Sequence, residues 1–124
     1  MKQFLIYTTL AFLAVSFPRL ALSDLIKAFK SGDISFVTAS LDNSVEITLS
    51  GQNESYSKSQ ATSMLSNFFS INRISDFKVL HQSESNETAY CIGNLITTGG
   101  TYRLTFFAKD KNGKTLLQEI RIEK

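Results

Sequence analysis

The sequence predicts an α+β domain in which a curved, mainly antiparallel sheet of about four or five strands wraps around helices. Two observations lead to this fold class. Apolar residues recur with the helical period in the first half of the chain, whereas from Asp76 to the end they alternate with polar residues. Short turns separate the alternating segments, which indicates that neighbouring strands run antiparallel.

The N-terminal segment has the layout of a cleavable secretory signal. A single charge at Lys2 precedes an apolar run over residues 4–15, which falls short of the roughly 20 apolar residues that a bilayer span needs. Small side chains at Ala21 and Ser23 predict cleavage after Ser23. We therefore expect export to the periplasm or the medium, with residues 1–23 removed and no membrane attachment afterwards. A retained anchor is the alternative.

The remaining residues, 24–124, suffice for one domain and leave no room for a second core. Cleavage removes Lys2 and Arg19, which leaves 11 of the 13 lysines and arginines against 11 acidic side chains. A neutral surface without clustered lysine or arginine supplies little attraction for phosphate. Nucleic acid is therefore not an expected partner.

Cys91 is the only cysteine, so an intramolecular disulfide is excluded and the fold depends on its hydrophobic core. It lies in a strand-like run, where a buried, inert thiol is the expected state and a reactive thiol is the alternative. One histidine and one cysteine without further ligands nearby do not predict a zinc site. We expect no metal and no cofactor.

Two helices are expected at the start of this domain. Asp24 places a carboxylate in the first turn of one helix, and Gly32 supplies its left-handed end. Asp33 is a suitable N-cap for a second, short helix that continues to Leu41. Alternating residues then predict a strand over residues 45–49.

A third helix follows a polar loop over residues 51–55. Ser57 and Gln60 form a capping box, in which each side chain bonds the backbone amide of the other residue. The next apolar residues share one face of a helix of about three turns, and that face is expected to cover a sheet. They are Ala61, Met64, Leu65, Phe68 and Phe69.

Four strands are expected from Asp76 onward, and the apolar pattern predicts how they pair. A turn centred on Ser85 and Asn86 sets His81 opposite Tyr90. With this pairing the apolar residues of the first two strands lie on the same face of the sheet.

The two following hairpins are expected to have three-residue turns. At residues 98–100 such a turn sets Ile92 opposite Phe106, whereas a two-residue turn would bring Ile92 beside a polar threonine. At residues 111–113, with the last glycine left-handed, it places Phe106 beside Gln118. Hydrophobic matching across the strands therefore selects the longer turn in both hairpins.

This pairing divides the side chains of the predicted sheet between two faces. The core face contains Phe77, Val79, His81, Tyr90, Ile92, Asn94, Ile96, Tyr102, Leu104, Phe106, Leu116, Gln118, Ile120 and Ile122. The opposite face contains Lys78, Leu80, Leu95, Arg103, Thr105, Phe107, Leu117, Glu119 and Arg121. Because this outer face is more apolar than a solvent-exposed face usually is, we expect a partner, such as the second subunit of a homodimer, to cover it.

Several segments of residues 24–124 carry a resemblance to a known family. They are Ala28-Phe29-Lys30-Ser31-Gly32-Asp33, Val45-Glu46-Ile47-Thr48, Tyr56-Ser57-Lys58-Ser59-Gln60-Ala61, Phe68-Phe69, His81, Tyr90-Cys91-Ile92-Gly93, Gly100-Thr101-Tyr102-Arg103 and Ile120-Arg121-Ile122. The chain resembles a family of short secreted bacterial proteins, mostly from Bacteroidota, catalogued as domain of unknown function 4783. The order of its elements is similar to that of the nuclear transport factor two-like superfamily, a cone-shaped α+β fold that includes ketosteroid isomerase-like domains.

The resemblance implies the cone fold and leaves the activity open, because the superfamily contains isomerases, dehydratases, ligand carriers and assembly domains. Our first hypothesis is an exported, noncatalytic domain that binds a small apolar ligand or a protein partner. The inward polar side chains predicted to meet the ligand are His81, Tyr90, Asn94 and Gln118.

The alternative is an isomerase- or dehydratase-type enzyme that uses the cone pocket. His81 would act as general base and Tyr90 as hydrogen-bond donor, since an imidazole titrates close to neutral pH. The inward set contains no carboxylate, so no catalytic residue is assigned. The two side chains also have a simpler explanation, as partners of each other or of the backbone at the mouth of the cone.

Overall fold

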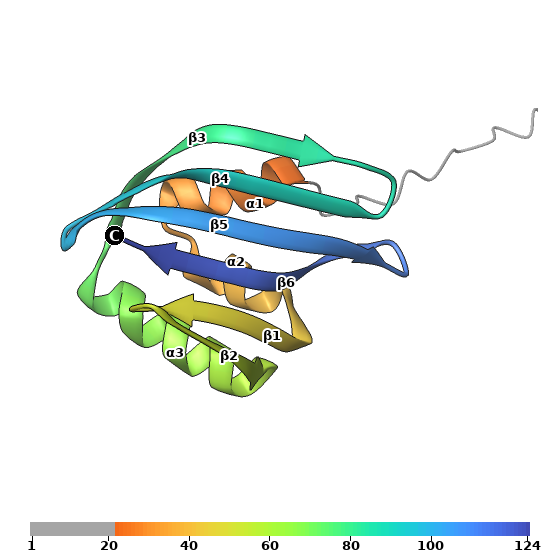
Figure 1. Ribbon diagram of the computed structural model, residues 1–124, viewed down its shortest axis with the longest axis horizontal. Coiled ribbons are helices and arrows are strands. Elements are labelled where there is room, and N and C mark those ends of the chain that lie inside the picture. The colour runs from red at the N-terminus through yellow and green to blue at the C-terminus, as the bar shows by residue number, and fades with distance from the viewer. Residues whose placement is uncertain (1–21) are drawn as a thin grey trace, which may run out of the picture.

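The computed structural model describes residues 22–124, so the predicted signal lies outside the described residues except for Leu22 and Ser23. No helix within this span is long and apolar enough to cross a bilayer. The helices are α1 (Leu22–Ser31), α2 (Ile34–Ala39) and α3 (Lys58–Ile71) (Figure 1). The strands are β1 (Leu41–Leu49), β2 (Gln52–Ser57), β3 (Ile74–Glu84), β4 (Thr88–Thr97), β5 (Gly100–Lys111) and β6 (Lys114–Glu123).

The strands form one sheet in the order β2-β1-β6-β5-β4-β3. Strands β1 and β6 run parallel, and the other neighbouring pairs run antiparallel. The sheet is curved, with α1 and α2 behind its centre and α3 beside β1 and β2 (Figure 1). The predicted α+β class and the mainly antiparallel curved sheet are confirmed, whereas the predicted number of strands is too small because the sheet has six.

The additional strand is β2, which occupies the segment predicted to be a polar loop. It pairs with β1 through a tight turn at Ser50 and Gly51, whose φ angles of 54° and 81° are both left-handed. Residues 52–55 are all exposed, so no apolar alternation marks the strand. Strand β2 is short and polar because it lies at the edge of the sheet, where neither face has to contribute to the core.

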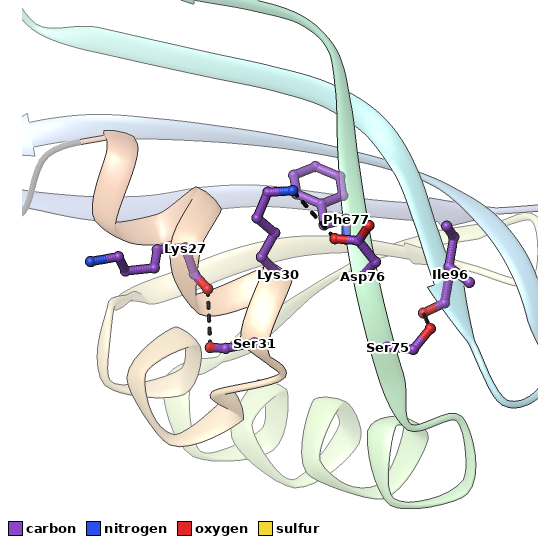
Figure 2. Close-up of polar contacts among 7 residues, drawn as sticks. All are labelled: Lys27, Lys30, Ser31, Ser75, Asp76, Phe77 and Ile96. Carbon is purple, nitrogen blue, oxygen red and sulfur yellow. Dashed lines mark hydrogen bonds and ion pairs between the residues drawn. The ribbon is translucent and has the colours of Figure 1, made fainter.

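Helix α1 lies inside the curve of β3 and β4. Its Phe29 is fully buried, and Gly32 ends the helix with a left-handed φ of 73°. Near this end Lys30 Nζ lies 3.3 Å from Asp76 Oδ1, and the same oxygen accepts a hydrogen bond from the backbone N–H of Phe77 (Figure 2). These contacts hold the end of α1 against the first residues of β3.

Both predicted helix caps are present. The Asp33 carboxylate accepts a hydrogen bond from the backbone N–H of Phe36 at 3.1 Å and starts α2. Ser57 Oγ accepts from the Gln60 N–H at 3.2 Å, and Gln60 Oε1 accepts from the Ser57 N–H at 3.1 Å, which completes the capping box of α3. Leu41, predicted to end the second helix, belongs to β1 instead, because it pairs with β6 in the sheet.

Helix α3 packs mainly on β1 and α2 and less on β2, whereas α1 fills the curve formed by the later strands. The apolar stripe predicted for α3 faces the core, although only some of its residues are fully buried. Its buried members are Ala61, Leu65 and Phe69, and its partly buried members are Met64 and Phe68.

Three phenylalanines from α1, β3 and β5 form the centre of the core. Phe29 stacks on Phe106 with ring centroids 5.2 Å apart and meets Phe77 at 5.9 Å, and the three side chains are fully buried. The Phe77 ring lies over Gly93 of β4, where an added Cβ atom would come within 2.5 Å of a ring carbon. A side chain at this position would therefore displace the ring.

The pairing of β4 with β5 differs from the prediction. The hairpin has a two-residue turn at residues 98–99, so that Cys91 lies opposite Phe106 and Ile92 lies opposite Thr105. The shift by one residue exchanges the two faces of β4, because side chains alternate along a strand. The buried face of β4 consists of Ala89, Cys91, Gly93, Leu95 and Thr97. The predicted inward residues of this strand, Tyr90, Ile92, Asn94 and Ile96, lie on the outer face.

Two features favour the shorter turn. The Thr97 hydroxyl donates to Gly100 O at 2.7 Å and accepts from the Gly99 N–H at 3.1 Å, which closes the turn. Both faces of β4 are also apolar, so hydrophobic matching does not distinguish the two registers. Leu95, predicted on the outer face, is fully buried for this reason. Leu117 of β6, also predicted on the outer face, is fully buried because the pairing of β6 with β5 shifts by one residue and sets it opposite Ala108.

The first and last hairpins of the predicted set also differ in register. In the first, a bulge between Val79 and His81 leaves Leu80 without a partner on β4. His81 consequently lies opposite Ile92 and not opposite Tyr90. The bulge was not expected because it interrupts the regular alternation on which the prediction depended.

In the last hairpin the turn consists of Asn112 and Gly113, with left-handed φ angles of 53° and 80°. Two consecutive left-handed residues make a tight turn that matches the twist of the strands, so the predicted three-residue turn is wrong. Phe106 pairs with Ile120, whereas Gln118 falls where the pairing of β6 with β5 shifts by one residue.

Candidate functional site

The side chains predicted to line the inside of the cone do not lie there. Tyr90 and Asn94 are on the outer face, because β4 presents its other residues to the core. The His81 and Tyr90 rings do meet, with centroids 5.6 Å apart and an edge-on tilt. Asn94 accepts a hydrogen bond from Arg103 Nε at 3.3 Å on the same outer face. The expected inward position of this group is therefore wrong.

Gln118 belongs to a separate polar cluster at the junction of β1 and β6. Its Nε2 donates to Asp42 Oδ2 at 2.7 Å, and Lys111 Nζ lies 2.6 Å from the same oxygen. The hydrogen bond from Lys111, followed by those from Gln118 and the Asn43 backbone, lowers the pKa of Asp42 to about 2. The four predicted residues therefore do not form one ligand site.

An open hollow of about 560 Å³ lies between the ends of the β3–β4 and β5–β6 hairpins. We call it the hairpin hollow. Ala89 and Ala108, which are paired across β4 and β5, line its inner part. Its walls carry the carboxylates of Glu84, Glu87 and Asp110 together with hydroxyl and amide side chains. The hollow is concave and open, so a small molecule can enter it.

Backbone hydrogen bonds shape the rim of the hairpin hollow. The Ser85 N–H donates to Thr88 O at 2.8 Å and closes the β3–β4 turn. The Asp110 N–H donates to Glu87 O at 2.7 Å, which continues the pairing of β4 with β5 up to the rim. The hollow is therefore bounded by hydrogen-bonded hairpin ends.

Asp110 differs from the other acidic side chains of the wall. Its Oδ1 atom is buried and has no hydrogen-bond partner among residues 22–124. A buried carboxylate oxygen without a donor is unfavourable, because it has lost its hydrogen bonds to water. The Asp110 carboxylate therefore has no compensating donor on its buried side within the described residues.

Sequence reasoning missed the hairpin hollow. The signal for it is the pair Ala89 and Ala108, because the neighbouring core positions of the same two strands carry larger side chains. The turn over residues 84–87, which contains two glutamates, lies beside this pair. Recognising the pair requires the correct register of β4 and β5, and the predicted three-residue turn does not provide that register.

Cys91 is fully buried, as predicted. Burial raises the pKa of its thiol to about 11. The group therefore stays protonated at neutral pH, which makes it a poor nucleophile. In the part of the chain that the structure describes, no three His, Cys, Asp or Glu side chains converge closely enough to hold a metal ion.

One family model matches all of the described residues except the last. The model of a family described as domain of unknown function, DUF4783, matches residues 22–123. The chain belongs to this family. The resemblance drawn from the sequence segments is confirmed by this match.

Solved structures of DUF4783 proteins share the fold. A family protein from Bacteroides ovatus is 31% identical and has a TM-score of 0.78, over 86% of this chain and 96% of that chain. A second, from Bacteroides uniformis, is 28% identical and has a TM-score of 0.78, over 84% and 96% of the two chains.

A more distant structure shows the wider fold class. A nuclear transport factor two-like protein of unknown function from Shewanella oneidensis is 12% identical, with a TM-score of 0.62 over 83% of this chain and 93% of that chain. This likeness shows the fold alone. No curated protein matches the chain.

Proposed function

We propose that this DUF4783 protein is an exported, noncatalytic domain that binds a small ligand in the hairpin hollow. The observation that carries the proposal is the hollow itself, whose volume is about 560 Å³. Small-molecule sites commonly measure roughly 300–1,000 Å³. Because the walls are polar, a polar ligand fits them better than the small apolar ligand expected from the sequence.

The arrangement of the core favours binding over catalysis. Acid–base chemistry in a cone-type enzyme needs a base and a donor in an interior that excludes water. Here the rings of Phe29, Phe77 and Phe106 occupy that interior. His81 and Tyr90, the candidates for an isomerase or dehydratase, meet on the outer face of the sheet.

A titration followed by NMR tests the binding role. We would add a library of small polar compounds to 15N-labelled protein and follow the backbone amides. The proposal expects the amides of Ala89, Ala108 and Thr115 to move, because these residues line the hollow. Ala108→Leu should weaken binding by filling the space, whereas Ala39→Leu, the same change at an exposed position at the end of α2, should not.

Thr115→Ile provides a second filling variant on the wall of the hollow, in case Ala108→Leu fails to fold. The proposal is contradicted if the compounds that bind move only residues outside the hollow, or if both filling variants bind them as the unmodified protein does.

A separate observation supports a homodimer. Phe107 is 37% exposed on the outer face and is paired with Tyr90, and Leu80, in the bulge of β3, is 56% exposed. We propose that a second copy covers this face. Glu119 and Arg121 lie two residues apart on β6. Across a two-fold axis, Glu119 of one copy can pair with Arg121 of the other.

Light scattering at micromolar protein concentration tests the homodimer. Phe107→Ser should shift the mass toward the monomer. The control is Ile71→Ser, because Ile71 is 71% exposed on α3, away from the proposed interface. A strict monomer across the concentration range would refute the homodimer and leave the binding role of the hollow unaffected.

A further inference from the structure

We infer that the hairpin hollow selects ligands that carry a positively charged nitrogen, such as a primary amine or a guanidinium. The inference rests on the proposed function, since it names the ligand class for the same hollow. It is supported by the charge of the walls, by the direction of the neighbouring lysines and by the Asp110 carboxylate, which has no donor among the described residues.

The charged side chains that line the hollow in the described part of the chain are all acidic. Glu84 is the last residue of β3, Glu87 lies in the β3–β4 turn, and Asp110 lies near the end of β5. The other lining residues are serine, asparagine, threonine and alanine. A cation that enters is attracted by these carboxylates and an anion is repelled, and the concave wall reduces screening by solvent.

The lysines closest to Asp110 in the sequence do not neutralise this wall. Asp110 and its partner Thr115 line the hollow, so the alternation of side chains directs Lys109 and Lys111 to the opposite face of β5. Lys111 forms its ion pair there, with Asp42, at 2.6 Å. The β5–β6 hairpin therefore separates its charges, with carboxylate toward the hollow and ammonium groups away from it.

The carboxylate of Asp110 can accept a donor from within the hollow. Its Oδ1 atom is buried and unpaired among the described residues, while the residue itself lines the wall. Because Oδ1 is buried, a donor in the hollow meets the other carboxylate oxygen of Asp110, which shares the negative charge of the group. An ammonium or guanidinium group that bonds this oxygen also supplies the opposite charge, which makes the hydrogen bond stronger than one from a neutral donor.

The spacing of the acidic groups favours an organic cation over a metal ion. Divalent metals need several oxygen ligands within about 2.0–2.6 Å of one point. Across residues 22–124 no three acidic, histidine or cysteine side chains meet this requirement. An organic ligand can instead place its donors at separate points along the wall.

Three probes of equal length test the charge selectivity. n-Butylamine, 1-butanol and butyrate would each be titrated at neutral pH into the labelled protein, with the amide shifts of Ala89 and Ala108 as the readout. We expect n-butylamine to bind at least about tenfold more tightly than the other two, and added salt to weaken it.

Charge-removing variants locate the effect. Asp110→Asn and Glu87→Gln should each weaken n-butylamine binding about threefold to tenfold. Glu46→Gln, the same type of change at an exposed position on β1 outside the hollow, should leave binding unchanged. If Asp110→Asn does not fold, Glu87→Gln in the exposed turn keeps the test valid.

The outcomes separate this inference from the proposed function. If the three probes bind equally and move the same amides, the preference for a positive charge is refuted and the hollow remains a binding site. If the library and the probes leave these amides unchanged, both proposals are refuted. If n-butylamine binds but the variants at Asp110, Glu87 and Ala108 do not weaken it, it binds elsewhere and the preference of the hollow for a positive charge is refuted, whereas the library titration still decides the proposed function.

Discussion

Two neighbouring cross-strand pairs of β4 and β5, here called rows, differ in whether the space beside them on the concave side of the sheet is filled. In one row Phe106 lies opposite Cys91 and stacks on Phe29 of α1, so the space next to the sheet is filled. In the next row Ala89 lies opposite Ala108, and the hairpin hollow opens beside them. The antiparallel backbone pairing is the same in both rows. The row with two small side chains therefore borders the hollow, whereas the row with the phenylalanine ring belongs to the filled core.

Removing one ring of the aromatic core should have the largest effect on stability. Phe29→Ala deletes a fully buried ring that contacts two others, and we expect the free energy of unfolding to fall by about 3–5 kcal/mol. Urea denaturation measures this loss. Phe107→Ala, which removes a ring that is 37% exposed, is the control and should cost much less. Equal losses in the two variants would show that the three-ring cluster is not the centre of stability.

Adding a methyl group in the filled region should be the next largest effect. In Gly93→Ala the new Cβ would come within 2.5 Å of the Phe77 ring and 2.6 Å of Lys78 O. We expect a loss of about 1–3 kcal/mol from overpacking. Part of the loss should disappear when Phe77→Leu is present, since that change removes the ring contact. A neutral Gly93→Ala in thermal melts would contradict the close packing described here.

The stability that Asp42 and its partners contribute should depend on pH, whereas the stability contributed by the rings of Phe29, Phe77 and Phe106 should not. The pKa of Asp42 falls from 3.8 to about 2 on folding, so its ionised form stabilises the protein above about pH 4 and this stabilisation is lost as the pH falls toward 2. The shift corresponds to about 2 kcal/mol. Asp42→Asn should remove most of this acid sensitivity, as measured by urea denaturation at several pH values.

Asp76→Asn is the matched control for Asp42→Asn. The pKa of Asp76 is also lowered, by the Phe77 N–H and then by Lys30, but this carboxyl is much more exposed than that of Asp42. Its removal should therefore change the acid sensitivity less. An Asp42→Asn variant that loses stability in acid just as the unmodified protein does would rule out the assigned role of the ion pair.

Filling the hollow should have the smallest effect on stability. Ala89→Val adds two methyl groups to a side chain that is 7% exposed at the inner end of the hollow, and we expect a change of no more than about 1 kcal/mol in either direction. Thermal melts alongside Gly93→Ala make the comparison direct, since both variants enlarge a small residue on the same face of β4. A loss as large as that of Gly93→Ala would mean that the hollow is as tightly packed as the core.

Local signals in the sequence predicted most of the elements but not their pairing. The capping box at Ser57 and Gln60 marks α3 because its hydrogen bonds depend only on neighbouring residues. The register of β4 depends on which of two apolar faces is covered, and the bulge at Leu80 interrupts the alternation on β3. Strand β2 was missed because a polar edge strand has no hydrophobic pattern.

The candidate site was harder to predict than the fold. His81 and Tyr90 were correctly expected to lie together, but the bulge on β3 and the reversed face of β4 place them outside the cone. The hairpin hollow arises from an absence of side-chain volume at Ala89 and Ala108. Such a feature has no motif and becomes visible only when the strands are paired correctly.

The predicted cleavage after Ser23 stays a prediction, and the structure makes it easy to test. Leu22 is only 5% exposed and belongs to the hydrophobic core, while Ser23 lies in α1. Cleavage at that bond would therefore remove one core side chain. The mass of the exported protein distinguishes a chain that begins at Asp24 from one that retains Leu22.

The bulge at Leu80 has a consequence for how this sheet behaves at high protein concentration. Strand β3 ends the sheet on one side, and its unpaired backbone groups are a template on which a strand of another molecule can add. A bulge breaks the even spacing of these groups, and the exposed Lys78 places a charge beside it. The opposite border, β2, is short and polar. Both edge strands therefore have features that oppose the edge-to-edge joining of sheets, which leads to fibrils.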